Sequence, residues 1–514
     1  MASDEVDALD EGSLDQFRID LIKAGFEPVT PGSRRRWRGP IAEPLTRLTA
    51  SAEMDILILD GWPFQPPKLL IPTKDIVSEH VAASGEFCLW RDDDASGQWM
   101  TLAGFLERIE EWCVQQASGF RAEDAMLDAH LYFTGATAGL ATVDVAALKI
   151  DERDVAGATN MIFGQWNGEQ TVLTLSPQRP KDGQALDGRW YYHAHDLTAP
   201  PRDLTAVRAA LTPGQQTNFD RRLNNVRTTG APHVAALLWA TEHGTNGLVL
   251  HLTRDGTGEA RAESLELAPS DIETLRLRCG PDAELLRPRH VTVFGAGSVG
   301  SHVALALAEA GLGRLRLVDR ETLRPGNTVR HASVLSVGDN KAIATSLRIR
   351  ISAPWTRTSA IEEIAWAPTR LVALMEDTDI AIDATGLARF TNLVSRIADQ
   401  HERPLISAAL YRGGAVARVR RQVPGRDVPI FKRTDESRYP LIPPGDEPLA
   451  LEPGCNAPVN NASPIAVAAI AALTAEIAID ALAGRWRFAE ETIDVYRPLD
   501  TAPFDRIGRP KPDA

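Results

Sequence analysis

The clearest succession of apolar and polar stretches runs from residue 291 to residue 319. Val291–Phe294 is a short apolar run of the kind that forms a buried strand, and a glycine-rich turn follows it at once. His302–Ala310 then has the Ala- and Leu-rich composition of a helix, and Leu315–Val318 is a second apolar run that ends in Asp319. The order strand, glycine loop, helix and strand predicts the first part of a doubly wound nucleotide-binding domain.

The turn has the pattern GxGxxG, formed by Gly295, Gly297 and Gly300. Glycines at these positions let the backbone turn tightly and approach a phosphate, whose charge is favoured by the helix N-terminus. Asp319 stands where a carboxylate accepts hydrogen bonds from ribose hydroxyls. The glycine pattern alone fits a NAD-dependent oxidoreductase at least as well as any other nucleotide-binding enzyme.

The residues that follow favour chemistry on ATP. Asn327 and Arg330 come shortly after Asp319, Lys341 follows later, and Asp383 ends a further predicted strand, Ile380–Asp383. Hydride transfer needs no such cationic set. Attack on the α-phosphate of ATP does, because Arg330 and Lys341 would stabilise charge on the phosphates and Asp383 would hold Mg²⁺.

This pattern resembles that of the ThiF family and of the adenylation domain of ubiquitin-activating enzymes, over about Arg287 to Ala483. The resemblance implies ATP-dependent adenylation of a protein's C-terminal carboxylate and a homodimer formed through the adenylation domains. Many ThiF relatives carry two C-x-x-C zinc pairs. The four cysteines of this chain are far apart and form no such pair, so we expect no structural zinc.

The first part of the chain shows a different pattern. Leu14–Phe26 has the spacing of an amphipathic helix, short β-type segments follow near Leu45–Ala50 and Met54–Leu59, and a further strand begins at Leu69. Thr101 then caps a strongly periodic helix, Leu102–Gln116, in a position typical of an N-cap. These elements predict a small α+β domain.

Between those strands and the last helix lie a rigid proline turn, Trp62–Pro67, and the sequence Gly85–Leu89, which contains Cys88. The order resembles that of ubiquitin-conjugating enzymes over residues 12–118. The resemblance implies that Cys88 carries an acyl group as a thioester and passes it to an amine. His80 stands where that family has an Asn that stabilises the oxyanion, so either His80 donates this hydrogen bond or another group supplies it.

Residues 120–285 carry no evident chemistry. Thr171–Leu175, Trp190–His193, His233–Ala240 and Leu248–Leu252 are strand-like, and Ala206–Val226 contains a helical stretch. The chain is therefore expected to be an α/β multidomain protein: a conjugating-like domain at 1–119, a mixed α/β linker domain at 120–285, and a doubly wound, Rossmann-like ThiF adenylation domain at 286–514.

Near the C-terminus, Arg421–Pro453 is rich in proline and charge, as surface loops are, and Cys455 follows it. In ubiquitin-activating relatives a cysteine in this region receives the adenylated carboxyl group, and Cys455 fits by position. Pro464–Ala483 is the one stretch apolar enough to raise a membrane question. Glu476 and Asp480 within it predict a buried helix of a soluble protein.

Composition limits the remaining possibilities. With 55 basic and 69 acidic residues the formal net charge is −14, which argues against general nucleic-acid binding. The N-terminus is acidic and has no apolar signal segment, so we expect a cytoplasmic protein.

The overall arrangement resembles the activating–conjugating fusion enzymes of bacterial anti-phage systems of the CBASS type. The resemblance implies ATP and Mg²⁺ as cofactors, acyl thioesters on Cys455 and then Cys88, and ligation to an amine of a target protein. The activated partner would expose a C-terminal tail and be a cGAS-like nucleotidyltransferase or a ubiquitin-like modifier. Three alternatives stay open: a ThiF-like enzyme for sulfur-carrier proteins, a NAD-dependent oxidoreductase, and a scaffold that uses both folds for binding only.

Overall fold

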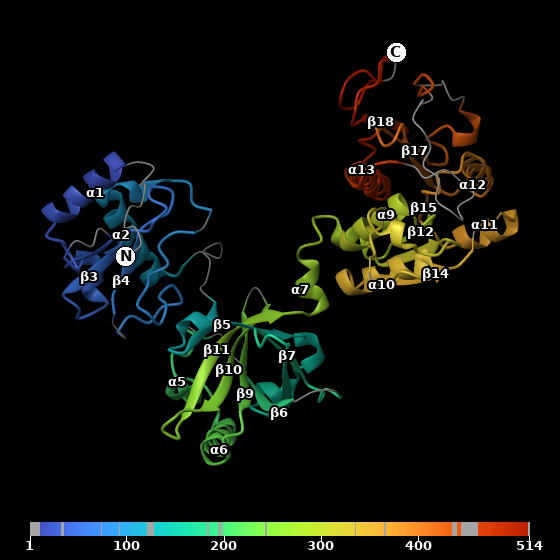
Figure 1. Cartoon of the computed structure of the whole chain (residues 1–514). Coiled ribbons are helices and arrows are strands. Elements are labelled where there is room, and N and C mark those ends of the chain that lie inside the picture. Colours follow the sequence, from blue (N-terminus) through green and yellow to red (C-terminus); the bar gives the residue numbers. More distant parts are fainter. Residues whose placement is uncertain are drawn as a thin grey trace. The chain divides into compact units, whose positions relative to one another are not determined.

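The computed structural model describes residues 11–31, 35–72, 75–91, 93–120, 128–181, 185–193, 197, 199–241, 244–334, 336–363, 366–433, 439–443 and 461–511. The chain divides into two compact units, which we call unit 1 (Met1–Asp271) and unit 2 (Ile272–Ala514). Figure 1 shows their elements, coloured along the sequence.

Unit 1 begins with a four-stranded antiparallel sheet in the order β1-β2-β3-β4. Its strands are β1 (Glu27–Pro28), β2 (Arg36–Pro40), β3 (Glu53–Leu57) and β4 (Lys68–Leu70). The helices α1 (Glu11–Lys23) and α2 (Leu102–Ser118) confirm the two predicted helices, and the hydroxyl of Thr101 caps α2 by accepting a hydrogen bond from the Gly104 amide.

The prediction of a strand near Leu45–Ala50 is wrong. Residues Glu43–Arg47 form the 3₁₀ helix η1, with a proline in its first turn and Leu45 fully buried. A proline fixes φ near the helical value and lacks the amide that a strand would use, so this segment turns instead of pairing.

The basic run around Arg36 belongs to β2. Asp55 of the neighbouring strand β3 is 1% exposed and accepts hydrogen bonds from Arg36 (2.7 Å) and Arg38 (2.7 and 3.0 Å). The arginines are thus partly neutralised within the sheet, as expected for a solvated strand.

The second part of unit 1 is a closed seven-stranded barrel, an architecture that the sequence did not predict. Its strand order is β10-β11-β5-β7-β6-β8-β9. The strands are β5 (Ala136–Val143), β6 (Thr159–Trp166), β7 (Val172–Ser176), β8 (Leu186–His193), β9 (His233–Thr241), β10 (Gly244–Arg254) and β11 (Ala260–Pro269). The segment also holds η3 (Ala129–Tyr132) and the helices α3 (Val145–Leu148), α4 (Glu152–Val155), α5 (Leu204–Ala209) and α6 (Pro213–Thr229).

Unit 2 is built on a seven-stranded sheet in the order β14-β13-β12-β15-β16-β17-β18. The first five strands in this order are parallel, and β17 runs antiparallel to both of its neighbours, β16 and β18. The strands are β12 (His290–Phe294), β13 (Arg314–Val318), β14 (Arg357–Ile361), β15 (Ile380–Asp383), β16 (Leu405–Tyr411), β17 (Val416–Gln422) and β18 (Glu491–Val495). This sheet confirms the predicted doubly wound fold.

Helices cover both faces of this sheet. Ile380 and Ile382 of β15 belong to a core cluster with residues of α9 (Ser298–Glu309), α10 (Lys341–Ser352) and α13 (Pro464–Leu482). Ala381, between them, belongs to a second cluster with α11 (Pro368–Met375) and α12 (Ala388–Gln400). Successive side chains of a strand point to opposite faces, so the two clusters lie on opposite sides of the sheet. Two short helices, α7 (Ile272–Arg276) and α8 (Ala283–Leu286), precede β12.

Among the described residues, α13 is the one helix long and apolar enough to cross a membrane. Its apolar window is 61% buried within unit 2, where the helix belongs to the core that it shares with α9. The Ser463 hydroxyl caps α13 by accepting a hydrogen bond from the Ala466 amide. The carboxylate of Asp480, which is fully buried, accepts hydrogen bonds from the backbone and side chain of Arg487 at 2.8 Å each. In unit 2, α13 is a core helix.

Candidate functional site

A pocket of unit 2 lies where the strand order changes direction. From β12 the chain moves outward through β13 and β14, and it then returns to β15 on the other side of β12. In open α/β sheets such a switch point leaves a crevice at the carboxyl ends of the strands. A pocket of about 460 Å³ is lined here by the start of α9, the ends of β15 and β16, and part of β17.

The glycine loop between β12 and α9 requires glycine at two positions, Gly295 for its backbone conformation and Gly300 for lack of space. Gly295 has a φ of +84°, in the left-handed region. At Gly300, a Cβ would lie 1.8 Å from the carbonyl oxygen of Gly295. Any side chain at position 300 would therefore push α9 away from the loop.

Gly297 differs from the other two glycines. It is the N-cap residue of α9, and a Cβ built on it meets nothing within 4 Å. It lines the pocket together with Ser298 and Val299, the first residues of the helix. The first amides of a helix have no partners within it, so this end of α9 suits an anion such as a phosphate.

Three more of the predicted residues line the same pocket: Asn327, Arg330 and Lys341. The guanidinium of Arg330 donates to the carbonyl oxygen of Ala462 at 3.1 Å, which places it against the start of α13. Lys341 is the first residue of α10 and is largely buried, and its ammonium group lies 2.6 Å from a carboxylate oxygen of Glu321. The pocket thus joins a helix N-terminus to two cations.

Asp319 lies beside the pocket and does not line it. Its carboxylate accepts hydrogen bonds from the amides of Ala296 (2.7 Å) and Glu321 (2.8 Å). Burial raises the pKa of Asp319, and these two hydrogen bonds act in the opposite direction. The carboxylate therefore ties the glycine loop to the end of β13, a role that the sequence did not reveal.

Asp383 is fully buried beneath the pocket. Its carboxylate accepts hydrogen bonds from the hydroxyl groups of Thr391 (2.5 Å), Thr385 (2.7 Å) and Ser407 (3.5 Å). Burial raises the pKa of Asp383, and the threonine hydroxyls oppose this shift. Carboxylate and hydroxyl oxygens are the donors that Mg²⁺ prefers, so the chemistry of this group fits that ion.

The pocket is also lined by side chains that the sequence did not point to, among them Glu321, Tyr411 and Arg420. Glu321 follows Asp319 by two residues and pairs with Lys341. Tyr411 ends β16, and Arg420 lies on β17. No motif distinguishes Tyr411 and Arg420 in the sequence, because strand pairing brings β16 and β17 to this site from outside the glycine-loop unit.

Cys88 lines a separate pocket, of about 800 Å³, in unit 1. Pro66, Pro67 and Trp90 form part of its wall, together with Leu131 and Phe133 from the start of the barrel segment. The amide of Ala83 donates to the carbonyl oxygen of Leu131 at 3.1 Å, which fixes this second wall. The thiol lies 3.9 Å from the carbonyl oxygen of Trp90. Cys88 is therefore reachable from a cavity.

His80 is close to Cys88 through its backbone: the Cys88 amide donates to the His80 carbonyl oxygen at 2.9 Å. Its imidazole is buried and stacks on Phe120, with the ring centroids 3.7 Å apart. His80 does not line the Cys88 pocket. A direct hydrogen bond from this ring to a group bound at Cys88 would require the ring to leave Phe120.

The remaining cysteines differ in setting. Cys455 lies outside the described residues. Cys113 is on α2, against the core of the first part of unit 1, and burial raises its pKa to about 11. Cys113 is therefore a partly buried thiol packed against the core.

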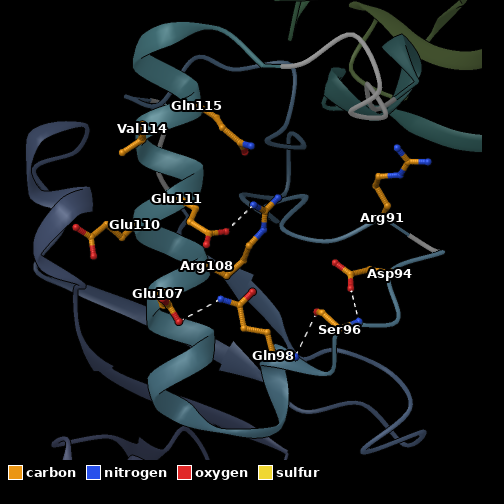
Figure 2. A pocket seen from close by; sticks show the side chains of 10 residues that line it. All are labelled: Arg91, Asp94, Ser96, Gln98, Glu107, Arg108, Glu110, Glu111, Val114 and Gln115. Carbon is orange, nitrogen blue, oxygen red and sulfur yellow. Dashed lines mark hydrogen bonds and ion pairs between the residues drawn. The ribbon is translucent and has the colours of Figure 1, made fainter.

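A polar groove lies on α2 and the loop from Arg91 to Gln98 (Figure 2). Its arginine Arg108 donates to the carbonyl oxygen of Leu89 at 2.6 Å and pairs with Glu111 at 3.1 Å. On the other side, Asp94 accepts a hydrogen bond from the amide of Ser96. Arg108 thus links this groove to Glu111 and to the backbone beside Cys88.

Comparison with known proteins places the second unit in a family. The model of the ThiF family matches residues 273–510. Protein y4oA of Sinorhizobium fredii is 23% identical over 459 residues, which cover 77% of this chain and 77% of y4oA. A match of that length extends beyond residues 273–510 into unit 1.

Two enzymes match over shorter stretches. The adenylyltransferase and sulfurtransferase uba4 of Neosartorya fischeri is 33% identical over 130 residues, 25% of this chain and 24% of uba4. The ATP-dependent ubiquitin transferase-like protein Cap2 of Enterobacter hormaechei is 34% identical over 117 residues, 22% of this chain and 19% of Cap2. This chain therefore spans a quarter or less of each of these two enzymes. The fold, the glycine loop and the family match together identify residues 273–510 as a domain of the ThiF family.

Proposed function

We propose that unit 2 uses ATP to adenylate the C-terminal carboxylate of a protein. One observation carries this proposal: the N-terminus of α9, Arg330 and Lys341 line a single pocket at the switch point of the sheet. Such a set suits a polyphosphate whose charge increases during reaction. The names of uba4 and Cap2, an adenylyltransferase and an ATP-dependent enzyme, support the same chemistry.

In the proposed step, a carboxylate oxygen forms a bond to the α-phosphorus of ATP. The bond from that phosphorus to the oxygen bridging to the β-phosphate breaks, and pyrophosphate leaves with the electron pair. The carboxylate reacts in its ionised form, so no proton is transferred. Arg330 and Lys341 offset the charge on the phosphates, and the first amides of α9 orient them.

Asp383 would hold Mg²⁺, with the hydroxyl groups of Thr391 and Thr385 as its closest polar neighbours. The ion, when bound, neutralises phosphate charge. Asp319 would offer its remaining acceptor capacity to the ribose hydroxyls, while its bond to the Ala296 amide keeps the glycine loop in place.

The proposal continues with a relay over sulfur. The thiolate of Cys455 attacks the acyl carbon, a C–S bond forms, and AMP leaves with the electron pair. The thiolate of Cys88 then displaces Cys455 in the same manner, and an amine of a target protein displaces Cys88 and loses a proton. The open pocket beside Cys88 supports its part in this relay. The order of transfer, Cys455 before Cys88, is the one that the resemblance to activating–conjugating fusion enzymes implies.

The partners in this proposal are a protein with an exposed C-terminal tail and a target with a free amine. The resemblance to anti-phage fusion enzymes, together with the name of Cap2, favours a cGAS-like nucleotidyltransferase or a ubiquitin-like modifier as the activated protein. The resemblance to the ThiF family implies a homodimer through the adenylation domains, and the cytoplasmic location stays a prediction.

A second candidate is activation of a sulfur-carrier protein, which the name of uba4 supports. Both functions begin with the same adenylate. They differ in whether the acyl group moves to Cys88.

The first test is exchange of labelled pyrophosphate into ATP by the full chain. Proteins encoded next to its gene serve as candidate substrates, each with and without its last residues. We expect exchange only with an intact tail, and a loss of roughly a hundredfold in Arg330→Gln. Exchange without any tail, or undiminished exchange in Arg330→Gln, would contradict adenylation at this pocket.

The second test asks whether Cys88 carries the acyl group. We expect an ATP-dependent adduct on non-reducing gels that thiols remove and that Cys88→Ser abolishes. Cys113→Ser is the matched control and should keep the adduct. Normal exchange without any adduct at Cys88 would favour the sulfur-carrier function instead.

A further inference from the structure

Arg420 is a cation of the unit 2 pocket with no hydrogen bond or ion pair among the described residues. It lines the pocket together with Arg330 and Lys341. Arg330 donates to the carbonyl oxygen of Ala462, and Lys341 pairs with Glu321. The side chain of Arg420 is partly buried, so its charge is shielded from bulk water without an acid hydrogen-bonded to it. Such a charge is costly unless a ligand pairs with it.

The register of the sheet places Arg420 close to the reaction centre. Arg420 of β17 lies opposite Ser407 of β16, and Ser407 lies beside Asp383 of β15. The hydroxyl group of Ser407 also donates to the Asp383 carboxylate at 3.5 Å. Arg420 therefore approaches Asp383 from the β17 side, whereas Lys341 and the start of α9 belong to the glycine-loop side.

The charges around Arg420 come from several elements. Arg418 lies two residues away on β17, and its charge is met by the buried Glu491 at 2.6 Å. Burial, followed by repulsion from Arg418, lowers the pKa of Arg420, while Tyr411, Glu491 and Asp383 act in the opposite direction. Glu491 lies opposite Arg420 in the β17–β18 pair but accepts its hydrogen bond from the guanidinium of Arg418 (2.7 Å). The neighbouring acid is thus already paired.

We propose that Arg420 binds the carboxylate that is to be adenylated, at the C-terminus of the protein substrate. This inference rests on the proposed function, since it names the group that receives the incoming tail. A guanidinium presents two parallel N–H donors that match the two oxygens of a carboxylate. It would also offset the repulsion between that carboxylate and the α-phosphate as the two anions approach each other.

The phosphates already have partners elsewhere in the pocket. These partners are the amides at the start of α9, Arg330 and Lys341. All of them belong to the segment from Gly297 to Lys341. The strand pair β16–β17 supplies another part of the lining, from Ser407 to Tyr411 and Arg420. An extended tail lying along these strands would bring its end to Arg420, while ATP occupies the glycine-loop side.

The proposal is tested on the full chain by chemical protection, without turnover. Phenylglyoxal modifies arginine side chains, and digestion followed by mass spectrometry reports the rate at each arginine. The probes are N-acetyl-glycylglycine, which has a free carboxylate, and its C-terminal amide, each at saturating concentration with AMP present. We expect the acid to slow modification of Arg420 roughly tenfold and the amide to leave it unchanged. The exposed Arg389 of α12 is the internal control and should react alike throughout.

Two results would overturn the proposal. Equal rates with the acid and the amide would show that Arg420 binds no carboxylate. Full protection by ATP but not by AMP would assign Arg420 to the β- and γ-phosphates. Because the measurement needs no reaction, it separates a failure of this proposal from a failure of adenylation itself, which pyrophosphate exchange tests.

A variant gives an independent readout once a tail that supports exchange is known. Arg420→Gln should raise the KM for that tail about tenfold or more and change the KM for ATP less than about threefold. Arg420→Lys keeps the charge but loses the two parallel N–H donors. Its affinity for the tail should lie between those of Arg420→Gln and the unaltered chain. Arg389→Gln should match the unaltered chain. An increase in the KM for ATP alone would contradict the proposal.

Discussion

The ammonium nitrogen of Lys341 lies 2.6 Å from a carboxylate oxygen of Glu321, and both side chains line the unit 2 pocket. The hydrogen bond from Lys341 is the main cause that lowers the pKa of Glu321. The carboxylate is therefore an internal anion at the place proposed for the phosphates of ATP. A bound nucleotide must compete with Glu321 for this ammonium group.

The competition gives the first prediction. Glu321→Gln should raise the affinity for ATP roughly two- to fivefold, because a partly exposed ion pair contributes at most about 1 kcal/mol. Lys341→Met should lower it roughly tenfold or more, because a charge-assisted hydrogen bond is lost. Isothermal titration calorimetry measures both, with the exposed Glu362→Gln as control. Weaker ATP binding in Glu321→Gln would show instead that Glu321 contacts the nucleotide.

The glycine loop gives a matched pair of substitutions. Gly300→Ala should destabilise unit 2 by about 1–3 kcal/mol, because its Cβ would lie 1.8 Å from the Gly295 carbonyl oxygen. Gly297→Ala meets no atom within 4 Å, so thermal unfolding should be unchanged while ATP binding weakens. Calorimetric unfolding and ATP titration of both variants separate stability from binding. Equal destabilisation by the two substitutions would contradict the geometry.

The sequence predicted the doubly wound sheet because its central strands are covered on both faces. Val291–Phe294 and Ile380–Ala381 are continuous apolar runs, as buried parallel strands require. The edge strand β14 has the sequence RTSAI, with no buried residue, and gives no such signal. The barrel strand β5, ATAGLATV, is built from small residues, so its inner and outer faces differ little in hydropathy.

The site was only partly predictable for a related reason. Gly297, Arg330 and Lys341 follow one another within the glycine-loop unit, and their spacing reveals them. Arg418 and Arg420 occupy equivalent positions on the same face of β17. What distinguishes the two arginines is Glu491, which belongs to a strand about seventy residues further on and pairs with Arg418. Only the strand order brings these residues together.

The acid sensitivity of unit 1 should depend on Asp55. Burial raises the pKa of this carboxyl group, but hydrogen bonds from Arg38 and Arg36 outweigh burial and lower it overall. The stabilisation is therefore fully present above the unfolded pKa of about 3.9 and is lost as the pH falls through the lower folded value. Asp55→Asn should cost about 1–3 kcal/mol at neutral pH and flatten the fall in stability below about pH 4.

Chemical unfolding of the full chain between pH 3 and pH 7 measures this dependence, followed by the fluorescence of the tryptophans in unit 1. The exposed ion pair between Lys23 and Asp20 on α1 provides the comparison, because Asp20→Asn should leave the free energy of unfolding nearly unchanged. A pH profile of Asp55→Asn that parallels the unaltered chain would show that the arginines do not stabilise the Asp55 carboxylate.

The two cysteines of the first part of unit 1 should differ in reactivity. Burial, together with the nearby Glu110, raises the pKa of Cys113 to about 11, so only about one thiol in a thousand is ionised at pH 8. Iodoacetamide should therefore label Cys113 roughly a hundredfold more slowly than free glutathione. Cys88 lines an open pocket and should be labelled first, as mass spectrometry of timed samples would show. Preferential labelling of Cys113 would mean that the Cys88 pocket is closed in solution, and a relay through Cys88 could not operate from that state.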